Sequence, residues 1–168
     1  VSVFVMVSAL RVAAQEKFET DTIKTSAGEL KLTFIGHATL IFEFGGKVIH
    51  VDPVSRMADY TKLPKADLIL VTHEHGDHFD PQALETLRTE KTVLVWPQSC
   101  AGRVEGGTVM NNGDVQTVAG LQVEAVPAYN LVHMRSPGRP YHPKGVGNGY
   151  VIIADAFWVV GATRAAHV

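Results

Sequence analysis

The feature of this sequence that most restricts its fold is a nearly continuous apolar run, residues 66–72, followed at once by residues 73–78, which read H-E-H-G-D-H. Such a run is typical of a strand that is covered on both faces of its sheet. The strand anchors the following loop at its upstream end, and we expect Gly76 to give this loop unusual backbone dihedrals. The chain must therefore form a sheet with a layer on each side, and the loop must present three histidines and an aspartate at one strand end.

The side chains of this loop are of the types that bind divalent metals. His73 and His75, which are separated by one residue, are placed to hold one ion, and Asp77 and His78 are placed to hold a second. Imidazole and carboxylate ligands suit Zn²⁺, with Mn²⁺ or Fe²⁺ as alternatives. A zinc site with an open position lowers the pKa of its water ligand to about 7 and so makes hydroxide available. We therefore predict one or two metal ions and hydrolytic chemistry.

Charge and cysteine content argue against several other classes of function. The formal net charge is −2 and no long basic run occurs, so a nucleic-acid partner is not expected. The single cysteine, Cys100, allows neither an intrachain disulfide nor a cysteine-rich zinc cage. The metal chemistry of this chain must therefore rest on its histidines and carboxylates.

The remaining sequence predicts short strands, tight turns and few helices. Asp80 is a candidate helix cap and Pro81 suits the first helical position. The polar residues 16–29 are expected to form an extended arm, and residues 128–148 a long loop. Strand patterns occur in residues 30–35, 38–44, 47–52, 66–72, 92–96, 115–118, 121–127, 149–154 and 157–160. This arrangement indicates a mixed α/β fold and not a purely parallel sheet.

The N-terminal segment has two interpretations. Residues 1–10 are apolar and uncharged, and the small residues Val12 and Ala14 resemble a signal-peptidase site. We interpret residues 1–14 as the remnant of a secretory signal of a periplasmic or secreted protein, and residues 15–168 as one domain. The alternative is an ordinary N-terminal strand of a cytoplasmic protein. The segment is too short to span a membrane, so stable membrane insertion is not expected.

The H-x-H-x-D-H pattern after a buried strand resembles the signature of the metallo-β-lactamase superfamily. Residues 34–39 (F-I-G-H-A-T), 51–53 (V-D-P) and 142–150 are similar to a branch of metal-dependent hydrolases related to the ascorbate-phosphate lactonases. The resemblance covers residues 31–160. It implies a four-layer αββα sandwich of the α+β class with the metals at one edge, of which this chain would supply mainly the N-terminal half.

The resemblance also implies roles for individual residues. The ligands that it assigns on the loop are His73 and His75 for the first metal, and Asp77 and His78 for the second. Asp77 would also accept a proton from the attacking water. A further histidine ligand of the first metal comes from later in the chain, and either His133 or His142 fits this place. His142 is favoured because it leads directly into the strand that begins near residues 147–149.

Five further residues are candidates for groups that orient the ligands or line the pocket. Asp52, at the end of a strand, would orient a ligand histidine or the loop backbone, or would be a simple turn carboxylate. His37 would lie near the metals, or between strands as an ordinary hydrogen-bonded histidine. Asn130 and Tyr141 bracket the long loop and are expected to line the pocket. His133 is expected to line the pocket or the surface if it is not a ligand.

The sequence departs from the family in one metal-binding turn. Where the family has Gly-Asp-Thr, whose aspartate bridges both metals, this sequence reads Gly161-Ala162-Thr163. Loss of the bridging carboxylate is expected to weaken the second metal most. The chain also looks truncated after its first half, and a sheet face without its partner layer would favour a homo-oligomer.

These observations predict a zinc-dependent hydrolase that uses metal-bound hydroxide on an ester, lactone, amide or phosphoester bond of a small-molecule substrate. Ester or lactone hydrolysis is the first choice, on the resemblance. The alternative is a truncated or non-catalytic metal-binding protein without useful turnover, which Ala162 favours. A nuclease is the weakest hypothesis, because the chain lacks a basic surface.

Overall fold

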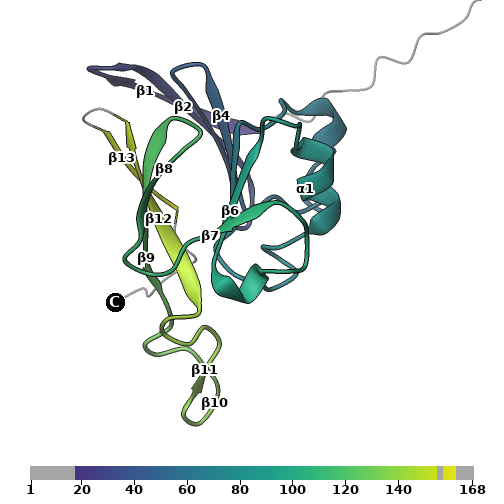
Figure 1. Ribbon diagram of the computed structural model, residues 1–168, viewed down its shortest axis with the longest axis vertical. Helices are drawn as coiled ribbons and strands as arrows, with labels where there is room; N and C mark the ends of the chain where they lie inside the picture. The colour runs from purple at the N-terminus through teal and green to yellow at the C-terminus, as the bar shows by residue number, and fades with distance from the viewer. Residues whose placement is uncertain (1–17, 155–156, 162–168) are drawn as a thin grey trace, which may run out of the picture.

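A seven-stranded sheet forms the centre of the computed structural model, which describes residues 18–154 and 157–161 (Figure 1). In spatial order its strands are β1 (Glu19–Thr25), β2 (Gly28–Gly36), β3 (Thr39–Phe44), β4 (Lys47–Val51), β5 (Leu68–Leu70), β6 (Val93–Trp96) and β7 (Gly107–Val109). Neighbouring strands are antiparallel from β1 to β4 and parallel from β4 to β7. The predictions for residues 1–14 and for Ala162 lie outside the described residues.

The helix predicted after Asp80 is α1 (Pro81–Leu87), which crosses over from β5 to β6. The Asp80 side chain accepts hydrogen bonds from the backbone N–H groups of Gln82 and Ala83, and Pro81 occupies the first turn as expected. Two 3₁₀ turns complete the helical elements of the described residues: η1 (Tyr60–Lys62) and η2 (Gln98–Cys100). The apolar side of α1 is fully buried, so this short helix is held by packing as well as by its cap.

A second, four-stranded sheet packs against the first. It contains β8 (Val115–Val118), β9 (Leu121–Ala128), β12 (Gly147–Ala154) and β13 (Phe157–Gly161) in the order β13-β12-β9-β8, with all neighbours antiparallel. Side chains alternate across a strand, so Ile69 of β5 faces α1 whereas Leu68 and Leu70 face the small sheet. Figure 1 shows the two sheets face to face, with α1 on the outer face of the larger one.

The predicted mixed α/β sandwich is confirmed as three layers: α1, the large sheet and the small sheet. The buried strand before the histidine loop is β5, which is covered on both faces as its apolar sequence predicts. In the described part of the chain, no helix is long and apolar enough to cross a membrane.

Three segments differ from the sequence-based expectation. The polar arm forms β1, which pairs along its whole length with β2, from Glu19 opposite Phe34 to Thr25 opposite Gly28. The short strand β7 was not predicted. The long loop 128–148 contains a small hairpin of β10 (Met134–Ser136) and β11 (Arg139–Pro140). Polar or short segments of this kind form strands because an existing strand offers them hydrogen bonds, which their own residues do not reveal.

Candidate metal centre

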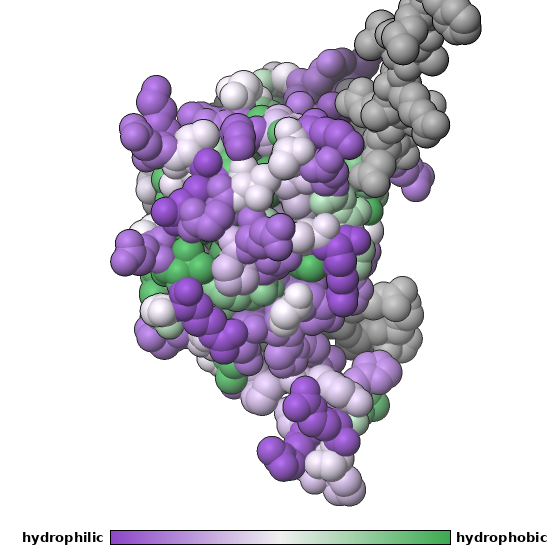
Figure 2. Space-filling view, turned by 90° about the vertical axis from the view of Figure 1, so that its right-hand side faces the viewer, coloured by the Kyte–Doolittle hydropathy of each residue, from purple (hydrophilic) through white to green (hydrophobic). Residues whose placement is uncertain are grey.

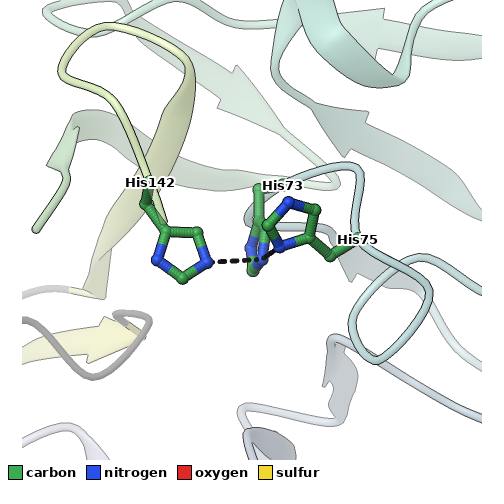
Figure 3. A group of neighbouring side chains, drawn as sticks. All are labelled: His73, His75 and His142. Carbon is green, nitrogen blue, oxygen red and sulfur yellow. Dashed lines mark hydrogen bonds between the residues drawn. The ribbon is translucent and has the colours of Figure 1, made fainter. Parts of the chain in front are cut away.

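The predicted metal ligands come together where the two sheets meet. The loop that follows β5 carries residues 73–78, and the chain approaching β12 carries His142. The Asn148 N–H at the start of β12 donates to the Thr72 carbonyl at 2.8 Å, and the Tyr150 hydroxyl donates to the Val71 carbonyl at 2.8 Å. These bonds hold β12 against the start of the histidine loop, and in Figure 3 His142 therefore points across at His73 and His75.

One group of potential ligands is made of three histidines: His73, His75 and His142. One ring nitrogen from each lies within 4.8 Å of the other two. The His73 Nε2 atom is 3.1 Å from His75 Nδ1 and 3.2 Å from His142 Nε2 (Figure 3). Three nitrogen donors that converge on one point are the protein contribution of many catalytic zinc sites.

The electrostatic environment keeps the imidazoles of His73 and His142 neutral, which is the form that binds a metal. Burial lowers the pKa of His73 to about 3, and repulsion from His78, His142 and His75 adds to the effect. Burial, followed by repulsion from His75 and His78, also lowers the pKa of His142. A cation at the centre of the group would therefore meet the lone pairs of His73 and His142 and not competing protons on these two rings.

A second group joins His37, Asp77 and His78, whose ligand atoms also lie within 4.8 Å of one another. The Asp77 Oδ2 atom is 3.2 Å from His37 Nε2 and 3.8 Å from His78 Nε2. Partial burial acts to raise the pKa of Asp77, but its own backbone N–H, His78 and His37 outweigh burial, so the pKa lies below its usual value. Sequence analysis placed His37 only near the metals, whereas here it lies in a ligand group.

Asp52 lies behind both groups and is completely buried. Its carboxylate accepts hydrogen bonds from the Thr72 backbone N–H at 2.7 Å and the Thr72 hydroxyl at 2.6 Å. Its Oδ2 atom is 2.7 Å from His78 Nδ1. A carboxylate can only accept from this nitrogen, which fixes the tautomer that leaves the His78 Nε2 lone pair facing the second group.

Two residues that sequence analysis did not assign to this role orient the other histidines. The Thr72 hydroxyl gives its one proton to Asp52 and is 3.0 Å from His73 Nδ1, so it accepts from that nitrogen. The Asn130 Oδ1 atom accepts from the His142 backbone N–H at 2.9 Å and is 2.6 Å from His142 Nδ1. Both contacts direct an Nε2 lone pair at the centre of the three-histidine group. No local pattern marks Thr72, because Asp52, to which its hydroxyl donates, is 20 positions away in the sequence.

The remaining predicted site residues are placed as follows. Tyr141 lines a small pocket beside His73, His75 and His142, whereas His133 is exposed in the loop before β10 and belongs to neither ligand group.

The backbone dihedrals of the site differ from expectation. Gly76 was expected to have unusual dihedrals, but it does not adopt a positive φ, so this expectation was wrong. Positive φ values occur instead at His37 (54°) and Asp52 (45°), two residues that contact the ligands directly.

Comparison with known proteins is consistent with this geometry. The family model described as a beta-lactamase superfamily domain matches residues 31–160. A UPF0173 metal-dependent hydrolase from Thermococcus kodakarensis is 32% identical over 142 residues, which are 79% of this chain and 60% of that protein. Another from Methanopyrus kandleri is 32% identical over 135 residues, which are 75% of this chain and 58% of that protein.

Solved structures show the same likeness. A crystal structure described as that of a candidate metal-dependent hydrolase from Parabacteroides distasonis is 41% identical and superposes with a TM-score of 0.81, over 89% of this chain and 67% of that one. The metallo hydrolase Igni18 from Ignicoccus hospitalis is 26% identical, with a TM-score of 0.62 over 81% of this chain and 61% of that one. The chain spans about 60% of the length of the curated relatives named above.

An αββ sandwich with histidine-rich ligand groups at one end of its strands places the chain in the fold class of proteins that are named metal-dependent hydrolases. More narrowly, the chain belongs to the metallo-β-lactamase superfamily, because the family model covers most of its length. The membership inferred from the H-x-H-x-D-H pattern is thereby confirmed, whereas the relation to ascorbate-phosphate lactonases stays a prediction.

Proposed function

We propose that this protein is a zinc-dependent hydrolase of esters or lactones. The observation that carries the proposal is the convergence of the ring nitrogens of His73, His75 and His142, with the His73 and His142 tautomers set by Thr72 and Asn130. Imidazoles arranged in this way fit Zn²⁺ well, and Mn²⁺ or Fe²⁺ less closely. Its relatives carry the name of metal-dependent hydrolases, which supports the reaction class.

The residues of the chain would bind the metal ions and accept a proton. His73, His75 and His142 would hold one ion, and His37, Asp77 and His78 offer a site for a second. When bound, zinc would supply a water ligand with a pKa of about 7 and a positive charge near the developing oxyanion. Asp77 is ionised at neutral pH, since its pKa is lowered, and would accept a proton from the attacking water. In the overall reaction, water adds across the acyl C–O bond and yields a carboxylic acid and an alcohol.

A second candidate function is metal binding without turnover. The observation that favours it is Ala162, which occupies the sequence position where the family has its bridging aspartate. Without that carboxylate the second ion would depend on His37, Asp77 and His78 alone. The two functions predict the same metal content but different activity, so one experiment separates them.

The experiment measures metal content and hydrolysis on the same preparations. Wild-type protein, His142→Ala and the matched control His133→Ala are reconstituted with Zn²⁺, dialysed and analysed by inductively coupled plasma mass spectrometry. Each is then assayed with a panel of lactones, aryl esters and phosphodiesters. We expect His142→Ala to lose at least about tenfold in zinc affinity together with its activity, and His133→Ala to retain both because His133 is exposed and outside the ligand groups.

The possible outcomes separate the hydrolase from the non-catalytic metal-binding protein. Bound zinc with lactone or ester turnover that requires His142 supports the hydrolase. Bound zinc without turnover on any substrate above the background of His75→Ala supports the non-catalytic alternative. Equal zinc affinity in wild-type protein and in His142→Ala would contradict the proposed ligand set itself.

A further inference from the structure

A hairpin projects from the body of the protein directly beside the three-histidine group. We call residues 130–142 the hairpin arm. Its base is closed by the Asn130 N–H, which donates to the His142 carbonyl at 3.0 Å, and its outer part is the β10–β11 ribbon. Figure 1 shows this ribbon extending below both sheets, and in Figure 2 the same protrusion stands clear of the body. One end of the arm is therefore fixed to a candidate metal ligand and the other reaches into solvent.

The arm and the residues that flank it carry positive charge and no negative charge. Residues 125–154 contain no aspartate or glutamate, but they include Arg135, Arg139 and Lys144. Among the described residues, none of these three cations forms an ion pair with a carboxylate, whereas Lys31, Lys62 and Arg88 elsewhere in the chain do. Cations without protein counter-ions attract anions from solution.

Apolar side chains lie along the arm between its base, which carries His142, and its two arginines. Leu131 and Val132 are 65% and 70% exposed, Met134 is 41% exposed and Tyr141 is 46% exposed. They follow the base of the arm, whereas Arg135 and Arg139 flank its turn. From the histidines outward, the arm therefore presents an apolar stretch and then positive charge. Arg139 is three residues from His142, so the backbone between them spans at most about 11 Å.

Tyr141 connects the positive charge to the pocket. Its ring lines the pocket beside His142, and the Arg135 guanidinium lies over the same ring, 5.4 Å from the centroid. Lys144 lies in a similar way over Tyr129, 5.5 Å from its centroid. Stacking of this kind orders a guanidinium while leaving its N–H donors available. Arg135 is therefore positioned next to a side chain that lines the pocket.

We propose that the hairpin arm selects substrates whose acyl part ends in an anionic group, separated from the reacting carbonyl by a short apolar chain. The inference rests on the proposed ester or lactone hydrolysis and names the substrate class of the same site. The reacting carbonyl would lie at the histidines, the apolar chain along Tyr141 and Leu131, and the anion against Arg135 and Arg139. Either a carboxylate or a phosphonate fits the guanidinium fork.

The test compares matched esters that differ only in terminal charge. 4-Nitrophenyl butyrate is neutral, 4-nitrophenyl hemiglutarate ends in a carboxylate, and the 4-nitrophenyl ester of 4-phosphonobutyric acid ends in a phosphonate. Zinc-loaded wild-type protein is compared with Arg135→Gln/Arg139→Gln and with the control Lys24→Gln/Lys91→Gln, which removes the same charge from exposed positions away from the arm. We expect wild-type protein to hydrolyse at least one anionic ester with a higher kcat/KM than the butyrate. Whichever of the carboxylate and the phosphonate ester has the higher kcat/KM identifies the anion that the arm prefers.

The expected result is a loss of selectivity. In the arginine double variant, the ratio of kcat/KM for the anionic ester to that for the butyrate falls roughly tenfold, mainly through KM, because one or two charge-assisted hydrogen bonds are lost. The lysine control leaves this ratio unchanged. Equal preference for charged and neutral esters in wild-type protein, or a ratio that falls equally in the control, would overturn the inference.

A binding measurement separates this inference from the hydrolase function. Calorimetry with the uncleaved amides, 4-nitrobutyranilide and the 4-nitroanilide of glutaric acid, reports recognition without turnover. Preferential binding of the acidic anilide that requires both arginines, without hydrolysis of any ester, would refute the hydrolase but uphold the arm. Sedimentation with phosphatidylserine vesicles that requires the same arginines, without ester or anilide selectivity, would assign the arm to a membrane surface and overturn the inference.

Discussion

At the scale of single residues, the candidate centre depends on three oxygen atoms that accept hydrogen bonds from imidazole rings. Asp52, Thr72 and Asn130 each contact an Nδ1 atom and thereby leave an Nε2 lone pair free. Because a neutral imidazole has one donor and one acceptor nitrogen, fixing the donor also fixes the acceptor. The three oxygens therefore determine both where the rings point and which atom each ring offers.

Asp52→Asn is expected to weaken metal binding at the group that contains His78. The amide keeps the size of the carboxylate, but its NH₂ group would compete with His78 Nδ1 and Thr72 as a donor at a completely buried position. Loss of such an orienting contact typically reduces metal affinity 10–100-fold. Chelator competition in wild-type protein and the variant, with circular dichroism as a check on folding, measures the change. Unaltered affinity in a folded variant would show that Asp52 is only a turn carboxylate.

His50 predicts a pH dependence of stability that is unrelated to the metal centre. It is completely buried in β4, its Nε2 atom donates to the Pro64 carbonyl at 3.0 Å, and its ring lies edge-on to Tyr60. Burial lowers the pKa of His50 to about 4, although the Pro64 carbonyl and Glu43 act in the opposite direction. Protonation below the ordinary pKa of about 6.5 therefore favours the unfolded chain.

The sign and size of this effect follow from the two pKa values. The contribution of His50 to stability is complete above about pH 6.5, falls as the pH drops from there to about 4, and levels off below, with a total change of about 3 kcal/mol. Urea unfolding of metal-free wild-type protein and His50→Gln across this range isolates the contribution as a difference. Parallel stability curves for the two proteins would contradict the assignment.

The sequence identified most residues of the candidate site, but it did not predict which of them contact one another. The loop histidines, Asp77 and the choice of His142 over His133 came from local spacing and from the resemblance. The contact of His37 with Asp77 joins residues 40 positions apart, and that of His142 with His73 joins residues 69 positions apart. Contacts of this range depend on how the sheets stack, which one-dimensional periodicity does not encode.

At the scale of elements, patterns with a strong local cause were predicted better than elements that depend on neighbours. The cap at Asp80 and the apolar run of β5 have local causes, and both elements formed as expected. The short strand β7 depends on the free edge of β6, which offers hydrogen bonds to Gly107 and its neighbours. Its place was not visible in the sequence because glycine disfavours strands when neighbours are ignored.

Gly107 is nevertheless required where it is, and Gly76 is not. A Cβ atom on Gly107 would lie 1.7 Å from Cζ2 of the buried Trp96 ring, whereas a Cβ on Gly76 would meet nothing within 4 Å. We expect Gly107→Ala to lower the free energy of unfolding by about 1–3 kcal/mol, since the ring must move in a packed core. Gly76→Ala should change it by less than about 0.5 kcal/mol.

Urea titration of the two glycine variants, together with zinc content, tests this contrast. The pair is well matched because both substitutions add one methyl group, and neither glycine has a positive φ. Retention of zinc by Gly76→Ala would show that the metal loop does not need glycine for its conformation. Equal destabilisation by both substitutions would mean that the packing around Trp96 adapts more easily than its contacts indicate.

At the scale of the whole molecule, the three-histidine group connects the two sheets. His73 and His75 follow β5 of the large sheet, whereas His142 precedes β12 of the small one.

The outer face of the small sheet carries no helix within the described residues. Homo-oligomerisation through such a face stays a prediction, for which light scattering should show a dimer or larger species. A periplasmic or secreted location likewise stays a prediction.

A metal that bridges the sheets should stabilise the whole fold and not only the loop. In the proposed site the native protein would bind zinc with all three histidines, whereas the unfolded chain cannot bring together residues that are 69 positions apart. Zinc at about 1,000 times its dissociation constant therefore adds roughly 4 kcal/mol to the free energy of unfolding. For a chain of this size, that corresponds to a rise of roughly 8–16 °C in Tm.

Calorimetric scans with zinc and with excess chelator measure the shift, and His142→Ala provides the control because it removes the one ligand that comes from the small sheet. We expect most of the zinc-dependent shift to disappear in this variant, whereas His133→Ala should keep it. A shift of full size in His142→Ala would place the bound metal on the loop alone, and the two sheets would then be held together by their apolar contacts without help from the ion.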